Sequence, residues 1–187
     1  SAVDDVYKGQ EFDGLPKSNY GASKLSAEIY IKLYESRGVD YTILRLFNVY
    51  GPGQDLSNMK QGMLSIYMSQ IILLKKVDVT GSFERYRDFI YIDDVVDSLI
   101  LAMEKKCNGE VYNVGTGYKK TVRELLDVLV HESRLGPVKI TNIGSGVGDQ
   151  FGTFANSKKL QALGWIPKMS LENGIAISFK NAIEELQ

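Results

Sequence analysis

Segments with the character of buried strands alternate with helix-forming segments along this chain, and this order restricts the fold more than any other feature. β-Branched and apolar runs predict strands, whereas apolar residues three or four positions apart predict helices. A helix between two strands provides the crossover that parallel pairing needs. Strands are predicted at residues 39–53, 77–81, 109–115 and 138–143. Helices are predicted at residues 20–37, 61–75 and 93–106, and a further helix is predicted to begin after residue 121. The order predicts an α/β fold with substantial parallel pairing.

Capping residues mark the ends of several predicted helices. Ser18 or Asn19 can cap the helix at 20–37, and Gly38 can end it. The sequence TVRE, residues 121–124, has the spacing of a capping box. Further signals are Asp93 and Asp94 opening a helix that Lys105 and Lys106 close, and Ser157 and Ser170 as caps of two final helices.

The sequence NYGASK places Tyr20 four residues before Lys24 in the first turns of the helix at 20–37. Residues four apart lie on one helix face, so the phenol and the ammonium can share a microenvironment. With eleven tyrosines, a random sequence of this composition contains about one such pair. The pair alone therefore decides nothing. The apolar stripe of this helix is predicted at Ala22, Leu25, Ile29 and Leu33.

Composition excludes several functional classes. The chain has 44% hydrophobic and 24% charged residues and a net charge of -1, which is typical of a soluble globular protein without a nucleic-acid surface. The longest near-apolar run, at 63–74, is too short to span a bilayer, so no membrane partner is expected. Cys107 is the only cysteine and His131 the only histidine, which rules out internal disulfides and the usual zinc spacings. A reducing, cytoplasmic setting without a bound metal is expected, with His131 near a helix C-terminus at the surface.

The start of a doubly wound nucleotide-binding sheet is not found in this sequence. Such a sheet begins with a strand, a glycine-rich turn and a helix. The sequences GTGYKK and GSGVGD both fail the G-x-G-x-x-G pattern, because Lys120 and Asp149 occupy its last position. We therefore expect the chain to lack the front half of the fold and its cofactor motif.

Six ordered blocks resemble a known family. YGASK, LRLFNVYGPG, RDFIYIDDV, EVYNVGTG, TVREL and GD…ANSKKLQALGW are similar, in this order, to the later part of the NAD-dependent nucleotide-sugar epimerase/dehydratase family. This family belongs to the extended short-chain dehydrogenase/reductases, and the match is UDP-glucose 4-epimerase-like. It implies the carboxyl-terminal part of a Rossmann-like doubly wound sheet plus a smaller α/β substrate-binding domain. Residues 1–58 would end the NAD-binding domain, and 59–187 would form the nucleotide-sugar region, with some elements packing back on the sheet.

The resemblance assigns roles to five residues. Tyr20 is the general base, and Lys24 binds the nicotinamide ribose and favours the phenolate form of Tyr20. Phe47 belongs to the cofactor site, and Asn48 follows it at the end of the predicted strand to contact a substrate phosphate. Arg87 of the RDF sequence binds the nucleotide diphosphate, a role that suits its fork of donors.

Other interpretations of the substrate contacts remain open. Arg87 could form a surface ion pair with Asp88 or Glu84. Asn48 could be a turn residue that bonds its own backbone. Tyr112 and Asn113 in the strand at 109–115 are interpreted as structural residues.

The chain also departs from the family pattern. The family usually has an arginine at the position of Gly146, so that nucleotide contact is absent or comes from another residue. Asp149 remains and can accept from ribose hydroxyls, or it is a loop residue. The position usually occupied by aspartate before Ser157 is Asn156. Ser1 lies near the place of the family's catalytic hydroxyl, or is a remnant of processing or cloning.

The resemblance favours one function over two others. We expect NAD-dependent epimerisation of a nucleoside-diphosphate sugar, with a UDP-sugar favoured, by a homodimeric enzyme of which this chain is an inactive fragment. A sugar 4,6-dehydratase is the alternative, because Asp4 and Asp5 loosely match its acidic pair. A non-catalytic nucleotide-sugar-binding or interaction module is a third hypothesis. Sugar specificity is expected to depend on residues 61–67 and 77–80.

Overall fold

Parallel strand pairs dominate the fold, as the alternating sequence predicts. The computed structural model describes residues 16, 18–55, 58, 62–144 and 151–185. Among them, β1 pairs with β6, β2 with β5 and β3 with β8, all in parallel, whereas β4 and β7 are antiparallel. The strands are β1 (Thr42–Leu46), β2 (Asn48–Tyr50), β3 (Lys76–Val79), β4 (Tyr86–Arg87), β5 (Phe89–Tyr91), β6 (Glu110–Val114), β7 (Lys120–Thr121) and β8 (Lys139–Asn142).

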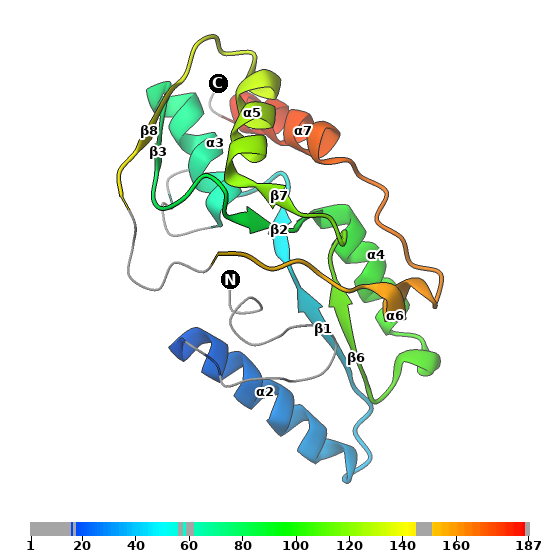
Figure 1. Cartoon of the computed structure of the whole chain (residues 1–187). Helices are drawn as coiled ribbons and strands as arrows, with labels where there is room; N and C mark the ends of the chain where they lie inside the picture. Colours follow the sequence, from blue (N-terminus) through cyan, green and yellow to red (C-terminus); the bar gives the residue numbers. More distant parts are fainter. Residues whose placement is uncertain (1–15, 17, 56–57, 59–61, 145–150, 186–187) are drawn as a thin grey trace.

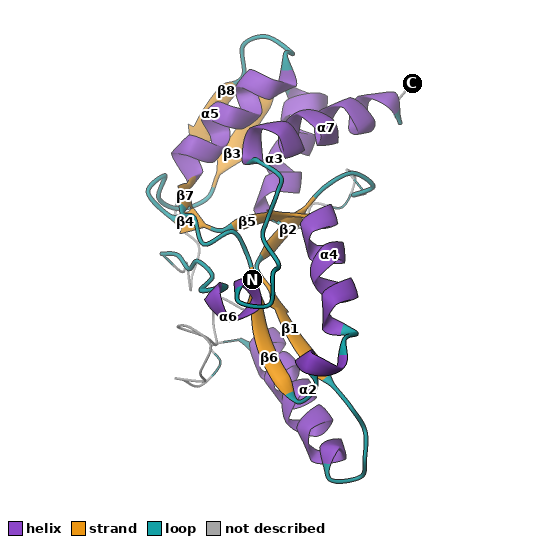
Figure 2. Cartoon of the chain, turned by 90° about the vertical axis from the view of Figure 1, so that its right-hand side faces the viewer, coloured by secondary structure: helices purple, strands orange, loops and turns teal. Residues whose placement is uncertain are grey.

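Helices flank the β1–β6 pair on two sides and form the other end of the molecule. In Figure 1, α2 lies on one side of β1 and β6, and α4 lies on the other; the turned view in Figure 2 agrees. At the far end, α3, α5 and α7 pack together beside β3 and β8. The helices are α2 (Asn19–Glu35), α3 (Met63–Leu74), α4 (Ile92–Ala102), α5 (Val122–Ser133), α6 (Lys158–Gln161) and α7 (Leu171–Glu184).

The prediction of a single strand at residues 39–53 is wrong in one respect, because this segment forms two strands that pair with different partners. β1 ends at Leu46, and the Phe47 N–H donates to Val114 O at 3.0 Å. The next residue, Asn48, starts β2, and its N–H donates to Asp88 O at 3.1 Å. The chain thus passes from the β1–β6 pair to the β2–β5 pair between Phe47 and Asn48.

Two hydrophobic clusters correspond to the two ends of the molecule. The larger cluster joins α3, α5 and α7 to β3 and includes Ile71, Leu125, Ile175 and Phe179, each at most 2% exposed. The smaller one lies around β6 and α4 and includes Trp165, whose indole N–H donates to Asp94 O at 2.9 Å. The predicted division at residue 58 stays a prediction, and β1 and β6 lie on opposite sides of it in the sequence.

Most predicted helix ends are confirmed by their hydrogen bonds. Ser18 Oγ accepts from Gly21 N–H at 3.0 Å, and Gly38 has φ of 80°. Thr121 and Glu124 form the complete capping box, and Ser170 Oγ accepts from Asn173 N–H. The helix after Ser18 therefore begins where local chemistry places it.

One predicted helix start lacks its side-chain cap, and one predicted helix end is wrong. Ser157 precedes α6 but makes no side-chain cap, because its buried hydroxyl donates to Gly115 O at 2.8 Å and so fastens the chain to the end of β6. Lys105 and Lys106 do not close α4, since they belong to a separate 3₁₀ turn, Lys105–Cys107, after the helix has ended at Ala102.

The apolar stripe predicted on α2 is only partly covered. Ala22 and Leu25 are half-buried, but Ile29 is 52% and Leu33 60% exposed. No helix within the described residues is long and apolar enough to cross a membrane. His131 lies in the last turn of α5 with its side chain 82% exposed, as predicted.

Candidate active site

A cleft of about 510 Å³ opens between α2, β1 and the first turn of α3. Tyr20 and Lys24 line it from α2, and Phe47 and Asn48 line it from the chain that leaves β1. The structure therefore brings together four of the residues that the sequence singles out. The segment at the start of α3, residues 62–65, also lines the cleft and overlaps the range predicted for sugar specificity.

Tyr20 and Lys24 occupy the first turns of α2, where the Ser18 cap fixes the start of the helix. Tyr20 is 58% exposed, so its phenol is accessible to a ligand. The Lys24 Nζ lies 5.2 Å from the centroid of the Tyr20 ring, which places the ammonium over the aromatic face. The predicted pairing on one helix face is thus realised in space.

Two other tyrosines differ from Tyr20 because they are buried. Tyr50 is 2% and Tyr112 3% exposed. Burial raises the pKa of Tyr50 far above its ordinary value, and it raises the pKa of Tyr112 to about 12, with nearby Cys107 adding to the effect. Burial thus keeps both phenols away from a ligand and makes their ionisation harder than that of a free tyrosine. Tyr112 is structural, as predicted.

Phe47 and Asn48 reach the cleft because the backbone changes partners there. Phe47 is 5% exposed and fills the junction between β1 and β2. Asn48 Nδ2 donates to Asp88 O at 2.9 Å, so the amide is held by the neighbouring strand rather than by its own turn. This bond orients the Asn48 side chain at the edge of the cleft.

Arg87 is not at the surface and is not among the residues lining the cleft. It is 8% exposed, and its Nη1 donates to Tyr86 O at 2.8 Å. The interpretation of Arg87 as a surface ion pair is therefore wrong. Glu84 was one of the partners considered for Arg87, but its Oε1 atom lies 3.8 Å from Arg123 Nε.

The buried carboxylate of Asp88 holds several segments of the chain together, a role that the sequence analysis did not predict. It is 0% exposed and accepts four hydrogen bonds: from Thr116 N–H at 2.9 Å, Thr116 Oγ1 at 2.6 Å, Gly117 N–H at 2.8 Å and Ala155 N–H at 3.0 Å. A Cβ on Gly115 would lie 2.8 Å from Asp88 Oδ2, which explains the glycine. Asp88 thus joins β5 to two loops.

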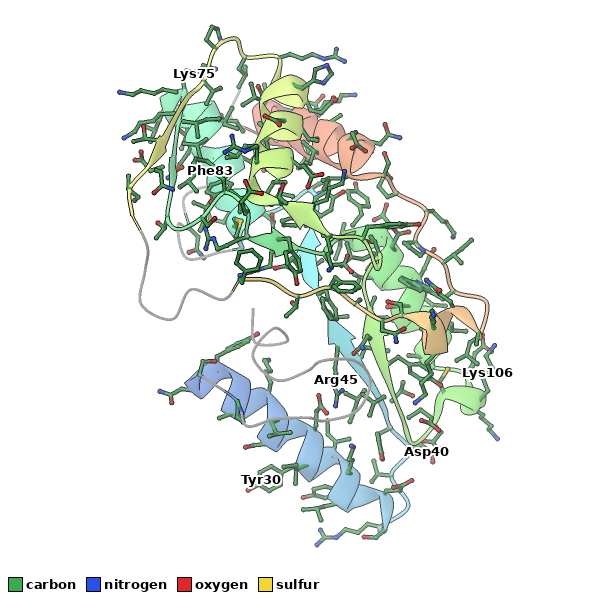
Figure 3. The ribbon with its side chains drawn as sticks, viewed as in Figure 1. Tyr30, Asp40, Arg45, Lys75, Phe83 and Lys106 are labelled. Carbon is green, nitrogen blue, oxygen red and sulfur yellow. The ribbon has the colours of Figure 1, made fainter. Side chains whose placement is uncertain are left out.

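Glu28 and Arg45 form a second buried link that the sequence analysis missed. Arg45 Nε and Nη2 donate to the two carboxylate oxygens of Glu28 at 3.0 and 2.9 Å, and the side chains are 6% and 12% exposed. Figure 3 shows Arg45 between β1 and α2. An arginine inside the apolar TILRL run is a signal that could have predicted a buried partner.

Other site residues proposed from the sequence lie outside the described residues. These are Ser1, Asp149 and the position of the missing arginine, Gly146. Asn113, interpreted as structural, is 1% exposed and its Nδ2 donates to Asn156 O at 3.3 Å.

The fold and cleft define an α/β protein with a tyrosine–lysine helix beside a parallel strand pair. The model of the NAD dependent epimerase/dehydratase family matches residues 5–115. A putative UDP-glucose 4-epimerase of Methanocaldococcus jannaschii is 35% identical over 161 residues, covering 86% of this chain and 52% of that protein. A mouse dTDP-D-glucose 4,6-dehydratase is 30% identical, covering 93% of this chain and 52% of the relative.

A solved structure agrees with these relatives. The Thermotoga maritima UDP-glucose 4-epimerase, solved with UDP-glucose, has a TM-score of 0.86 and 34% identity, covering 92% of this chain and 56% of its own. This chain belongs to the NAD-dependent epimerase/dehydratase family, in the extended short-chain dehydrogenase/reductases, with a Rossmann-like fold. It spans about half the length of the curated relatives it matches.

Proposed function

We propose that this chain carries the proton-transfer residues and the sugar-nucleotide contacts of an NAD-dependent nucleotide-sugar epimerase, with a UDP-sugar as the favoured substrate. The observation that carries the proposal is the shared cleft, in which Tyr20 and Lys24 meet Phe47 and Asn48. The rest of the enzyme corresponds to the half of the relatives' length that this chain does not span. The two parts together are here termed the complete enzyme. We propose a cytoplasmic homodimer.

The residues of the cleft fit the nicotinamide end of NAD. An ammonium at Lys24 can donate to ribose hydroxyls, and the apolar side chain of Phe47 suits a flat ring. The described residues contain no G-x-G-x-x-G turn for the pyrophosphate. NAD, when bound, supplies the hydride acceptor and donor.

In the proposed reaction Tyr20 moves the proton. Its Oη accepts the proton of a sugar hydroxyl as the carbon that carries this hydroxyl is oxidised. Tyr20 returns the proton after the keto sugar has rotated to present its opposite face. Lys24 favours the phenolate form of Tyr20 by its positive charge. Tyr20 is suited to this because its phenol is exposed in the cleft, unlike those of Tyr50 and Tyr112.

A dehydratase is the alternative reaction, supported by relatives such as the mouse enzyme. The acidic pair considered for it, Asp4 and Asp5, lies outside the described residues. A non-catalytic sugar-nucleotide-binding module is the third candidate, and relatives that are named as enzymes argue against it.

Product analysis tests the proposal. The complete enzyme is incubated with UDP-, GDP- and dTDP-sugars, and products are resolved by chromatography and mass spectrometry. An epimer has the mass of its substrate, whereas a dehydratase product is lighter by one water. Product of unchanged mass from a UDP-sugar is the expected result; loss of water favours the dehydratase, and no product favours the binding module.

Replacing Arg87 and Asn48 by alanine is expected to weaken nucleotide-sugar binding to different extents. We assign Arg87 to the diphosphate and Asn48 to a phosphate. A hydrogen bond to a charged group contributes roughly 1.5–3 kcal/mol, so Arg87→Ala should have the larger effect. Titration calorimetry with UDP on the complete enzyme measures both, and bound NAD content should not change. Unaltered UDP affinity in both variants would exclude the phosphate assignment.

This chain alone is expected to bind no NAD tightly and to lack epimerase activity. Phosphate recognition in a doubly wound fold needs glycines for close approach and the amides of a helix N-terminus. The exposed Ile29 and Leu33 on α2 also leave an apolar face that tends to associate. Calorimetry with NAD and with UDP tests this expectation. Micromolar NAD binding by the 187-residue chain contradicts it, whereas weak UDP binding alone agrees with it.

A further inference from the structure

Tyr20, Lys24 and Glu28 follow one another at intervals of four residues along α2, and all three line the cleft. Residues four apart on a helix are neighbours, and lysine and glutamate at this spacing attract one another. From α2 alone, Glu28 therefore has two lysine partners at this spacing, Lys24 inside the cleft and Lys32 one turn further along the helix. A pair with Lys24 would draw the ammonium away from Tyr20 and toward the next turn.

The structure has a different pairing. Both Glu28 carboxylate oxygens accept from Arg45, at 3.0 Å from Nε and 2.9 Å from Nη2. A guanidinium matches a carboxylate with two parallel bonds, and this geometry is stronger than a single contact with an ammonium. The pair is buried, at 6% and 12% exposed. Meanwhile the Lys24 ammonium lies over the Tyr20 ring.

We propose that Arg45 is a positioning residue that holds Glu28 away from Lys24, so that the Lys24 ammonium stays with Tyr20 and with the cofactor. The proposal rests on the proposed function of Tyr20 and Lys24. It assigns to a strand residue, 25 positions away from Tyr20 in the sequence, a role in the protonation of the base.

The charged residues that line the cleft are the groups that can compete for the Lys24 ammonium. Among the residues that the structure describes, the charged and titratable ones lining the cleft are Tyr20, Lys24, Glu28 and Arg45, while the described lining residues from α3 and the rest of β1 are uncharged. Without Arg45, Glu28 would carry an uncompensated buried charge. Lys24 and Lys32 both lie four residues from Glu28 on α2, and of these two only Lys24 lines the cleft. A Lys24 paired with Glu28 supports the phenolate less, because a carboxylate near a phenol disfavours its negative form.

Three variants of the complete enzyme test the proposal: Arg45→Met, Glu28→Gln and the double variant. The measurements are the pH dependence of kcat and, separately, the midpoint of thermal unfolding. For Arg45→Met we expect kcat at neutral pH to fall about tenfold and the rising limb of the profile to move by about one pH unit to higher pH. The double variant should recover the parent's profile, because the neutral amide introduced by Glu28→Gln cannot compete for Lys24.

A purely structural role gives a different pattern. If the pair only attaches α2 to β1, Arg45→Met and the double variant lower kcat and thermal stability together, without moving the profile. That pattern overturns the proposal, as does an unshifted profile in all variants. If Arg45→Met does not fold, Arg45→Gln provides the test, since a neutral amide leaves the Glu28 charge uncompensated; a shift to higher pH supports the proposal, and no shift overturns it.

Tyr20→Phe, measured in parallel, separates this proposal from the proposed function. If Tyr20→Phe retains the parent's rate, Tyr20 is not the base and the proposed function fails with it. If Tyr20→Phe is inactive but the Arg45→Met profile is unmoved, the function stands and only the role of Arg45 is wrong.

Discussion

Replacing Tyr20 by phenylalanine is expected to lower kcat of the complete enzyme by ~10²–10⁴-fold, which is the usual contribution of a general acid–base group. The change removes one oxygen from a side chain that is 58% exposed in the cleft, so the fold and the nucleotide-sugar affinity should be preserved. Steady-state rates with the preferred sugar nucleotide and calorimetry with UDP measure the two quantities.

Tyr30→Phe is the matched control for this prediction. Tyr30 lies on the same helix and is 65% exposed, but it is not among the residues lining the cleft, and Figure 3 shows its side chain on the far side of α2 from Arg45. The control should keep the parent's rate. A Tyr20→Phe variant as active as Tyr30→Phe would remove Tyr20 from the mechanism.

Asp88→Asn is expected to destabilise this chain by about 3 kcal/mol or more, because the amide cannot accept all four hydrogen bonds. The NH₂ group that the substitution introduces would face donors from Thr116 or from Gly117 and Ala155. The site is 0% exposed, so water cannot replace the lost acceptor. Denaturant unfolding measures the effect as a lower midpoint at constant slope.

Asp93→Asn makes the same chemical change at an exposed position close by in the sequence. Because Asp93 lies in the first turn of α4, where its charge interacts favourably with the helix dipole, this change should lower stability by no more than about 1 kcal/mol. Equal midpoints for the two variants would show that the Asp88 hydrogen bonds contribute little. A loss confined to Asp88→Asn would establish this carboxylate as the link between β5 and the loops carrying Thr116 and Ala155.

Local signals were sufficient for several features of this protein. Ser18, Thr121 with Glu124, and Ser170 cap helices in the structure because a cap depends on bonds to residues two or three positions away. The four-residue spacing places Tyr20 and Lys24 on one helix face for the same reason. The family resemblance, carried by ordered blocks, is confirmed by the comparisons.

Contacts between segments that are distant in the sequence could not be predicted from such local signals. Ser157 has the sequence position of a helix cap, but its hydroxyl bonds to Gly115, 42 positions away. Arg87 has acidic neighbours in the sequence, which suggests a surface ion pair, yet its side chain is buried. For Ser157 a tertiary contact replaced the local alternative, because burial makes an unpaired polar group costly; for Arg87 it is the burial itself that the local sequence did not indicate.

The sequence by itself determined the α/β class, the helix starts, the family and the tyrosine–lysine pair, since each depends on short-range periodicity or on motif order. Only the tertiary structure decided that the chain changes strand partners between Phe47 and Asn48, that Asp88 holds two loops, and that Arg45 takes the carboxylate of Glu28. Those contacts join residues 17 to 67 positions apart, where many pairings are possible from sequence and packing selects one.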